Sequence, residues 1–370
     1  MRTVGVEEEL LLVDDTTGVP MAVADAILSR HAAPGATEDG RGSEPGGTVE
    51  MELQLQQIET DTLPSERLDE LARRVVEGRA KADRLARLTG ARVAALATSP
   101  LPVSPQTTPK PRYGAMVEHF GLTTSEQLTC GCHVHVSIDS PDEGVAVLDR
   151  IRVWLPTLLA LSANSPFWQG VDSGYASYRS QVWNRFPTAG PNDVFGSPGA
   201  YSGRVDALLG SGVALDTGMI YFDARLSANY PTVEIRVADV CLDAEDAVMV
   251  AALVRALVET AARQWRSGED APIMPTALIR AAGWRAGRSA LAGDLLDPLT
   301  GKPRAAGAVV ESLLAHVAPA LADIGDESLV QEALSRLLDR GPGAAFQRAR
   351  YELSGDLRTV VHEAVDYTVG

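Results

Sequence analysis

Three consecutive carboxylates, Glu7, Glu8 and Glu9, lie in the middle of an otherwise apolar segment near the start of the chain. The segment Thr3–Val13 has the valine and leucine content of a β-strand, in which successive side chains point to opposite faces. Glu7 and Glu9 therefore share a face, and Glu8 points away from it, so a change at Glu8 is expected to matter much less. Carboxylates on one face repel each other, and a divalent cation such as Mg²⁺ is the simplest group to hold them together. From this segment alone, two other interpretations stay open: a solvated edge strand with an acidic outer face, or a strand whose carboxylates pair with Lys or Arg.

Two histidines occur at the same alternating spacing in the segment Gly131–Ile138. The alternation predicts a strand with apolar residues on one face and His133 and His135 on the other. Imidazole nitrogens are good ligands for metal ions and good partners for phosphates. The alternative is a pair of hydrogen-bonded histidines on an exposed sheet face. In an acidic chain with only six histidines, the pair favours a ligand site.

Two further segments carry charged residues on one strand face. Thr232–Ala238 places Glu234 and Arg236 together, which is typical of an ion-pair ladder or of a metal ligand beside an anion-binding arginine. Thr48–Ile58 alternates as one half-buried strand, and the pattern puts the next carboxylate, Glu59, on its apolar face. If these faces line one sheet surface, they form a carboxylate-rich bowl. Such a bowl suits two or three Mg²⁺ or Mn²⁺ ions, which stabilise charge in phosphoryl transfer.

The elements that must position these residues divide the chain into two parts. We expect one catalytic domain, residues 1–370, with a sheet-forming part at about 1–240 and a helical part at about 241–370. Asp14–Gly47 is rich in Gly and Pro and predicts a surface excursion with one short helix. Asn164–Gly199 is long, irregular and aromatic, which favours a functional loop over disorder. No glycine-rich phosphate loop is present, so a nucleotide would bind through metal and sheet.

The composition limits the classes of function. The chain has 370 residues, 45% of them hydrophobic, which is enough for a core. Asp and Glu outnumber Lys and Arg by 49 to 33, and a net charge of −16 argues against a nucleic-acid partner. No apolar run approaches the ~20 residues that span a bilayer, and no signal peptide precedes the first strand. We therefore expect no membrane association and a cytoplasmic location. Three cysteines are too few for a disulfide scaffold.

Five motifs occur in a distinctive order: GVEEELLLVD, QLQQIET, CGCHVHVSID, ALSANSPFWQG followed by YASYRSQVWNRFP, and TVEIRVAD. Together they closely resemble the bacterial ATP-dependent carboxylate–amine ligases, the family of type-2 glutamate–cysteine ligases. The resemblance implies an α+β fold related to glutamine synthetase: a curved, mostly antiparallel sheet that binds Mg-ATP, with helices packed outside. It also implies that ATP phosphorylates a substrate carboxylate, and that an amine then attacks the acyl phosphate to give an amide, ADP and phosphate.

The same resemblance implies roles for individual residues. The residues that match metal ligands are Glu7, Glu9, Glu59, His133 and Glu234. His135 would lie near the ATP phosphates, and Arg236 matches an arginine that faces them. Arg179 and Arg225 fit arginines that hold phosphate or a substrate carboxylate. The implied partners are an amino acid or other carboxylate and an amine, with no nucleic acid, and a homo-oligomer, a dimer, is expected.

The motifs do not specify the two substrates. Glutamate and cysteine are the family label, with which weak γ-glutamylcysteine synthesis is compatible, but a member could join another acid and amine in specialised biosynthesis. Two other classes stay open on the residues alone. A metal-dependent amide hydrolase would use the same bowl to activate water and would turn over without ATP. A catalytically silent protein would bind metal or nucleotide without releasing phosphate.

Overall fold

The centre of the molecule is an open antiparallel sheet. The structure, a computed structural model, describes residues 1–31 and 47–370. Within them the sheet has seven strands in the order β2-β3-β1-β5-β9-β8, and β4 pairs with the far end of β1. Its strands are β1 (Val4–Asp14), β2 (Val49–Met51), β3 (Gln57–Asp61), β4 (Ala91–Ala94), β5 (Gly131–Ser137), β8 (Ala224–Leu226) and β9 (Thr232–Asp239). The predicted α+β class with an antiparallel sheet is confirmed.

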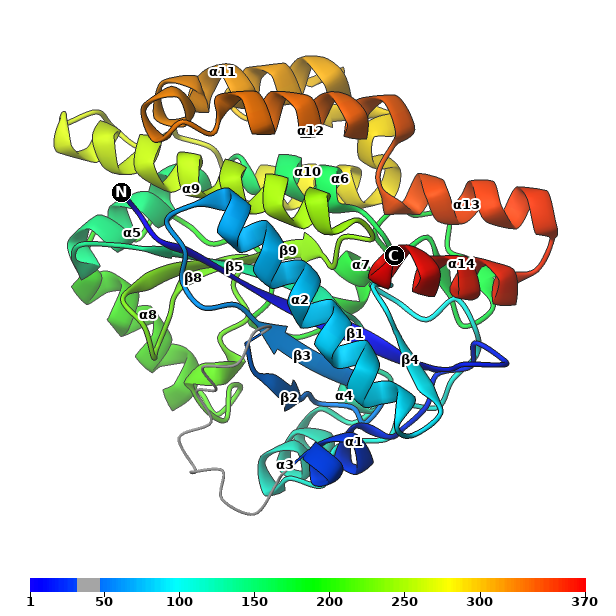
Figure 1. Cartoon of the computed structure of the whole chain (residues 1–370). Coiled ribbons are helices and arrows are strands. Elements are labelled where there is room, and N and C mark those ends of the chain that lie inside the picture. The colour runs from blue at the N-terminus through cyan, green and yellow to red at the C-terminus, as the bar shows by residue number, and fades with distance from the viewer. Residues whose placement is uncertain (32–46) are drawn as a thin grey trace.

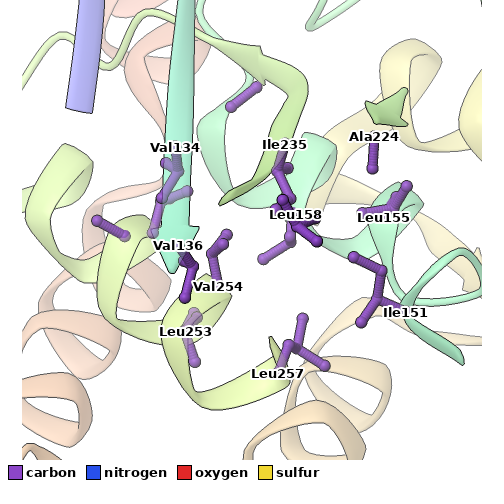
Figure 2. Close-up of a cluster of buried hydrophobic side chains, with 14 of the residues drawn as sticks. Val134, Val136, Ile151, Leu155, Leu158, Ala224, Ile235, Leu253, Val254 and Leu257 are labelled. Atoms are coloured by element: carbon purple, nitrogen blue, oxygen red, sulfur yellow. The ribbon is translucent and has the colours of Figure 1, made fainter. Parts of the chain in front are cut away.

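Helices cover one face of this sheet (Figure 1). This layer contains α2 (Leu68–Arg87), α5 (Pro141–Ile151), α6 (Leu155–Ser162) and α9 (Ala244–Arg266). α9 begins where the Asp243 side chain accepts a hydrogen bond from the backbone N–H of Glu245, which satisfies a free donor of the first turn. Figure 2 shows aliphatic side chains of the sheet and these helices meeting in one core: Val134, Val136, Ile151, Leu155, Leu158, Ala224, Ile235, Leu253, Val254 and Leu257. Burial of this apolar face fixes which side of each strand is left for chemistry.

The chain after β9 is mostly helical. It contains α10 (Thr276–Ser289), α11 (Ala306–Ile324), α12 (Glu327–Arg340), α13 (Gly343–Ser354), α14 (Leu357–Val369), the 3₁₀ turn η2 (Ala290–Ala292) and a small hairpin of β10 (Asp294–Leu296) and β11 (Pro303–Ala305). α11 and α12 lie over α9, and α14 lies beside α2 and β4 (Figure 1).

α11 is the one helix in the described residues that is long and apolar enough to cross a membrane by length and composition. We predicted no such segment, because no apolar run in the sequence approaches ~20 residues. Glu311 and Asp323 interrupt the apolar run of α11. Of its most apolar window, 33% is buried inside the molecule. The buried residues include Val310, Leu313 and Val317, which recur at helical spacing and belong to the main core. This stripe is typical of a helix that packs on a protein core.

The prediction of one strand over residues 48–58 is wrong, because this segment folds back on itself. β2 ends at Met51, the N–H of Gln57 donates to the carbonyl of Gln54, and β3 returns antiparallel to β2. The alternation of the sequence is not broken by Gly or Pro, so periodicity alone could not reveal the reversal. As a result Glu59 lies inside β3, directly opposite Glu9 of β1.

Residues 141–162 form two successive helices, α5 and α6, and a 3₁₀ turn, η1 (Thr217–Met219), precedes the short β8. The aromatic segment after residue 164 contains β6 (Phe167–Trp168), β7 (Val171–Asp172), α7 (Arg179–Trp183) and the start of α8 (Pro198–Gly210). The predicted surface excursion contains the short helix that we expected, α1 (Ala24–His31). Residues 32–46 of the excursion lie outside the described residues. The remaining helices are α3 (Pro111–Phe120) and α4 (Leu122–Ser125).

Candidate active site

The sheet face opposite the helices brings most of the predicted site residues together. In the strand register, Glu7 of β1 is opposite His133 of β5, and His135 of β5 is opposite Glu234 of β9. On the other side of β1, Glu9 is opposite Glu59 of β3. Because directly opposed residues share a sheet face, carboxylates and imidazoles from four strands meet on one surface.

The first cluster consists of Glu7, His133 and Glu234, whose ligand atoms all lie within 4.8 Å of one another. A carboxylate oxygen of Glu7 lies 3.5 Å from Nδ1 of His133, and the other lies 3.1 Å from Nε2 of His135. Burial raises the pKa of Glu7, but its contacts with the two imidazoles outweigh burial and hold the pKa well below its usual range. Glu7 is therefore an anion at neutral pH.

His133 has the state that a metal ligand needs. Burial, with help from the nearby Arg236 guanidinium, lowers its pKa to about 4, so the ring is neutral. Its Nε2 is buried and has no hydrogen-bond partner among the described residues. The register of β5 against β9 shifts between Cys132 and Val134, and such bulges re-aim a side chain. A buried neutral imidazole between carboxylates fits a divalent cation.

His135, two residues along the same strand, differs in charge. Burial lowers its pKa, but the contact with Glu7 outweighs burial, and the pKa is raised above its usual value. Its Nδ1 lies 3.0 Å from the hydroxyl of Thr232. The contact with Glu7 therefore favours the protonated form of His135, which suits an anionic ligand better than a cation.

A second cluster of Glu9, Glu52 and Glu59 has ligand atoms within 4.8 Å of one another. Burial and the neighbouring Glu52 raise the pKa of Glu9 to about 7, although its carboxylate accepts a 2.6 Å hydrogen bond from the N–H of Gly131. Burial and the nearby carboxylates raise the pKa of Glu59 well above its usual range. Arg179 and Arg236 lower the pKa of Glu9, but neither forms an ion pair with this cluster. Three crowded carboxyl groups of this kind fit a divalent ion.

Glu52 was not predicted as a site residue. The single-strand interpretation placed it on the polar face away from Glu59, whereas the reversal between β2 and β3 places it beside Glu9 and Glu59. No turn residue in the sequence signals this reversal. The position of Glu52 follows from tertiary pairing, because the neighbouring Leu55 donates its N–H to the carbonyl of Gln106 in a distant loop.

Two arginines hold the carboxylate of Glu234. Arg225 of β8 donates from Nε at 2.6 Å and from Nη2 at 3.1 Å, and Arg236 of β9 donates from Nη1. Burial raises the pKa of Glu234, but Arg236 and Arg225 outweigh burial and lower it to about 2. Arg236 is also stacked over the ring of Trp183, 5.7 Å from its centroid. Both arginines are therefore in place to bind an anion next to the first cluster.

Arg179 lies elsewhere. Its guanidinium donates to the backbone carbonyls of Arg236 and Val237, behind the strand end that carries Gly131. A Cβ on Gly131 would lie 2.3 Å from Nη2 of Arg179. The structure does not place Arg179 on the cavity that holds the two clusters.

Both clusters open into one cavity of about 760 Å³. Beyond the predicted residues, its walls include Glu52, Arg112, Tyr113, Trp183, Tyr221 and Tyr230. Arg112 forms an ion pair with Asp216 at 2.6 Å. This volume lies within the range of about 300–1,000 Å³ that is typical of small-molecule sites.

Glu8 points away from this cavity, as predicted, but not to solvent. It is 2% exposed and forms a two-pronged ion pair with Arg79 of α2, with distances of 2.6 and 2.9 Å. Arg79 also donates to the backbone carbonyls of Cys241 and Leu242. Glu8 is therefore part of the contact between the sheet and α2, and the expectation of a minor role applies only to chemistry.

Solved structures of other enzymes share this fold. The glutamate–cysteine ligase of Francisella tularensis in complex with AMP matches with a TM-score of 0.64 and 13% identity, over 100% of this chain and 89% of that chain. A bifunctional glutathione synthetase from Pasteurella multocida matches with a TM-score of 0.63 and 16% identity, over 99% of this chain and 52% of that chain. At these identities the likeness shows the fold alone.

Relatives with similar sequences identify the family to which the chain belongs. The model of glutamate–cysteine ligase family 2 matches residues 3–364. "Putative glutamate–cysteine ligase 2-1" of Streptomyces avermitilis is 52% identical over 370 residues, covering 100% of both chains. "Putative glutamate–cysteine ligase 2" of Streptomyces coelicolor is 52% identical over 368 residues, covering 100% of this chain and 99% of the relative. The chain belongs to glutamate–cysteine ligase family 2, as its motifs predicted.

Proposed function

We propose that the protein is an ATP-dependent carboxylate–amine ligase that forms an amide through an acyl phosphate, with glutamate and cysteine as the first substrate pair to test. The observation that supports this most is the pair of carboxylate clusters on either side of β1, which share one cavity with Arg225 and Arg236. Family membership supports ATP use and ligase chemistry. The substrates come from the names of the relatives alone.

The two clusters would hold divalent cations, with Mg²⁺ the first choice and Mn²⁺ an alternative. Glu7, His133 and Glu234 would bind one ion, and Glu9, Glu52 and Glu59 would bind another. Oxygen-rich sites suit Mg²⁺, and the imidazole in the first cluster also suits Mn²⁺. Bound ions would neutralise the ATP phosphates and the charge that develops during phosphoryl transfer.

The residues of the cavity fit the two steps of amide formation. In the first step an oxygen of the substrate carboxylate bonds to the γ-phosphorus of ATP, and the bond to ADP breaks. In the second step the amine nitrogen bonds to the carbonyl carbon, loses a proton, and phosphate leaves. Arg225, Arg236 and the protonated form of His135 supply positive charge for the phosphoryl group in both steps.

The aromatic wall of the cavity fits a second need of this chemistry. An acyl phosphate must be kept from water, which would hydrolyse it before the amine arrives. Tyr221 and Phe186 are buried in the cavity wall, and the ring centroids of Trp183 and Tyr221 are 4.7 Å apart. We expect these rings to exclude bulk water from the acyl group.

ADP release by the purified protein tests the proposal. With ATP and Mg²⁺, we expect ADP formation that requires both an acid and an amine, first with glutamate and cysteine and then across a panel of amino acids and amines. Glu9→Gln should abolish it, while Glu245→Gln, a matched change at an exposed ion pair on α9, should not. Cleavage of amides without ATP would support a hydrolase and overturn the proposal.

A dimer and a cytoplasmic location stay predictions.

A further inference from the structure

A second, smaller cavity lies against the back of the first. Its volume is about 260 Å³, and its lining includes Arg179, Asp223 and Arg280 together with Trp183 and Arg236. Trp183 and Arg236 line both cavities. The two spaces therefore have part of their walls in common.

Arginine side chains in this cavity have unused donors. Arg179 and Arg236 are 2% and 8% exposed, and the Nε atom of each is buried with no hydrogen-bond partner among the described residues. A buried donor without a partner costs free energy, so such a group in a native structure calls for a ligand or water. Both arginines line the smaller cavity and add positive charge to its wall, which favours an anionic group there.

Arg280 stands at the mouth of the same cavity. A Cβ on Gly190 would lie 3.1 Å from Nη2 of Arg280, so the guanidinium rests against the Gly190 backbone. The carbonyl of Gly190 accepts a 3.0 Å hydrogen bond from the N–H of Asp223. Arg280 is thus placed beside the segment that carries the one carboxylate lining this cavity.

Asp223 is half-buried, and its carboxylate makes no hydrogen bond and no ion pair within the described part of the chain. Burial raises its pKa to about 6, against the opposing effect of Arg280 and Arg179. At neutral pH the group is mostly an anion that has lost much of its hydration without gaining a donor. An ammonium group would satisfy it.

The remaining lining is apolar and aromatic: Leu155, Pro156, Leu159, Trp183, Ile279 and Trp284. A carboxylate site, an ammonium site and an apolar wall occur together in a space that suits a molecule of few heavy atoms. We propose that this second cavity binds a free α-amino acid with an uncharged side chain, its carboxylate held by the arginines and its ammonium group by Asp223. The proposal does not depend on amide formation in the larger cavity.

A larger surface groove near the C-terminus offers no comparable set of groups. Its arginines are already paired: Arg336 with Glu245, Arg340 with Asp246, and Arg350 with Glu363. The contrast supports the smaller cavity, where the side chains of Arg280 and Asp223 make no hydrogen bond or ion pair among the described residues.

Ligand-observed NMR titration of the full chain, with a chelator and without ATP, tests the proposal. The probes are L-alanine, L-valine and L-cysteine, with propionate lacking the ammonium group and ethylamine lacking the carboxylate. We expect the amino acids to bind about tenfold or more tightly than either analogue. Asp223→Asn should remove the preference for alanine over propionate, and Arg280→Met should weaken both. Neither side chain makes a hydrogen bond or ion pair within the described residues, so both variants should fold.

Two further variants assign the result to one cavity. Glu9→Gln, in the larger cavity, should leave amino-acid binding unchanged, as should Glu245→Gln on the surface. Amino acids that bind equally well to wild type and to Asp223→Asn, that bind only with Mg²⁺, or that do not bind at all would overturn the proposal. ADP release is measured separately, so its absence alongside retained binding would count against the ligase and not against this site.

Discussion

Three adjacent glutamates have three different chemical states, although the sequence distinguishes them only by position. Glu7 is held as an anion by imidazoles, Glu9 has its pKa raised to about 7 by burial and by Glu52, and Glu8 is paired with Arg79 on the other face. Alternation along a strand separates Glu8 from its neighbours. The difference between Glu7 and Glu9 comes from the residues opposite them: Glu7 lies opposite His133 of β5, and Glu9 lies opposite Glu59 of β3.

His133→Ala should reduce ATP turnover by about a hundredfold or more, because loss even of a group that only supports a metal ligand costs about 10–100-fold. The fold should persist, since the imidazole makes no backbone hydrogen bond among the described residues. ADP release and the circular dichroism melting curve measure the two effects. Glu245→Gln is the control. Wild-type turnover by His133→Ala would show that His133 is not part of the site.

Glu8→Gln should destabilise the protein by about 3 kcal/mol, because it leaves Arg79 buried without its counter-ion. Urea unfolding measures the free energy, and ADP release at low temperature should be nearly normal for the folded fraction. Adding Arg79→Met should not restore stability, because the carbonyls of Cys241 and Leu242 would then lose their donor. Normal stability of Glu8→Gln would show that this ion pair contributes nothing.

The raised pKa of Glu9 predicts how stability depends on pH. The folded, metal-free protein keeps a proton on Glu9 up to about pH 7, whereas an unfolded chain loses it near the usual 4.5. The free energy of unfolding should therefore fall as pH rises through this window, by on the order of 3 kcal/mol for Glu9 alone. Urea unfolding in a chelator measures it. Glu9→Gln has no carboxyl group to titrate and should make the profile shallower, while Glu59, whose pKa is also raised, still contributes. An unchanged slope in that variant would contradict the assignment.

At the scale of elements, strict alternation predicted β1, β5 and β9 and the face that each turns to the site. The same alternation failed at β2 and β3, because a pattern of period two continues unchanged through a tight reversal that lacks Gly and Pro. Glu52 was missed for that reason. Arg179 was assigned to phosphate or substrate by its motif, but its backbone partners Arg236 and Val237 come from β9, which no local pattern could indicate.

The approach of α7 to β5 allows no side chain at Gly131. Gly131→Ala would place a Cβ 2.3 Å from Nη2 of Arg179, which must move away from the end of β9. We expect a loss of about 1–3 kcal/mol in stability and reduced ADP release, because the N–H of Gly131 also holds Glu9. Gly307→Ala on α11, where a Cβ meets nothing within 4 Å, is the control. Equal stability of the two variants would contradict the close approach.

At the scale of the whole molecule, cations and fold should stabilise each other, because the ligands come from strands far apart in the sequence. Mg²⁺ at about 100 times its Kd should raise the free energy of unfolding by about 3 kcal/mol. Thermal unfolding with and without the ion measures this, with Ca²⁺ as a comparison. Glu9→Gln should lose part of the gain, and an equal gain in that variant would place the ion outside the second cluster.

The strand order also determines when each ligand of the site becomes available during synthesis of the chain. β1 leaves the ribosome first, yet it occupies the middle of the sheet and pairs with β5, whose other neighbour is β9. The acidic face of β1 can pair with β3 and β5 early, but Glu234 of β9 joins the first cluster only after more than half of the chain is made. Contacts this distant in sequence form slowly. A nascent or truncated chain that ends before Glu234 lacks one ligand of the first cluster. Cation binding at that cluster is thus a late event, and it would distinguish finished molecules from unfinished ones.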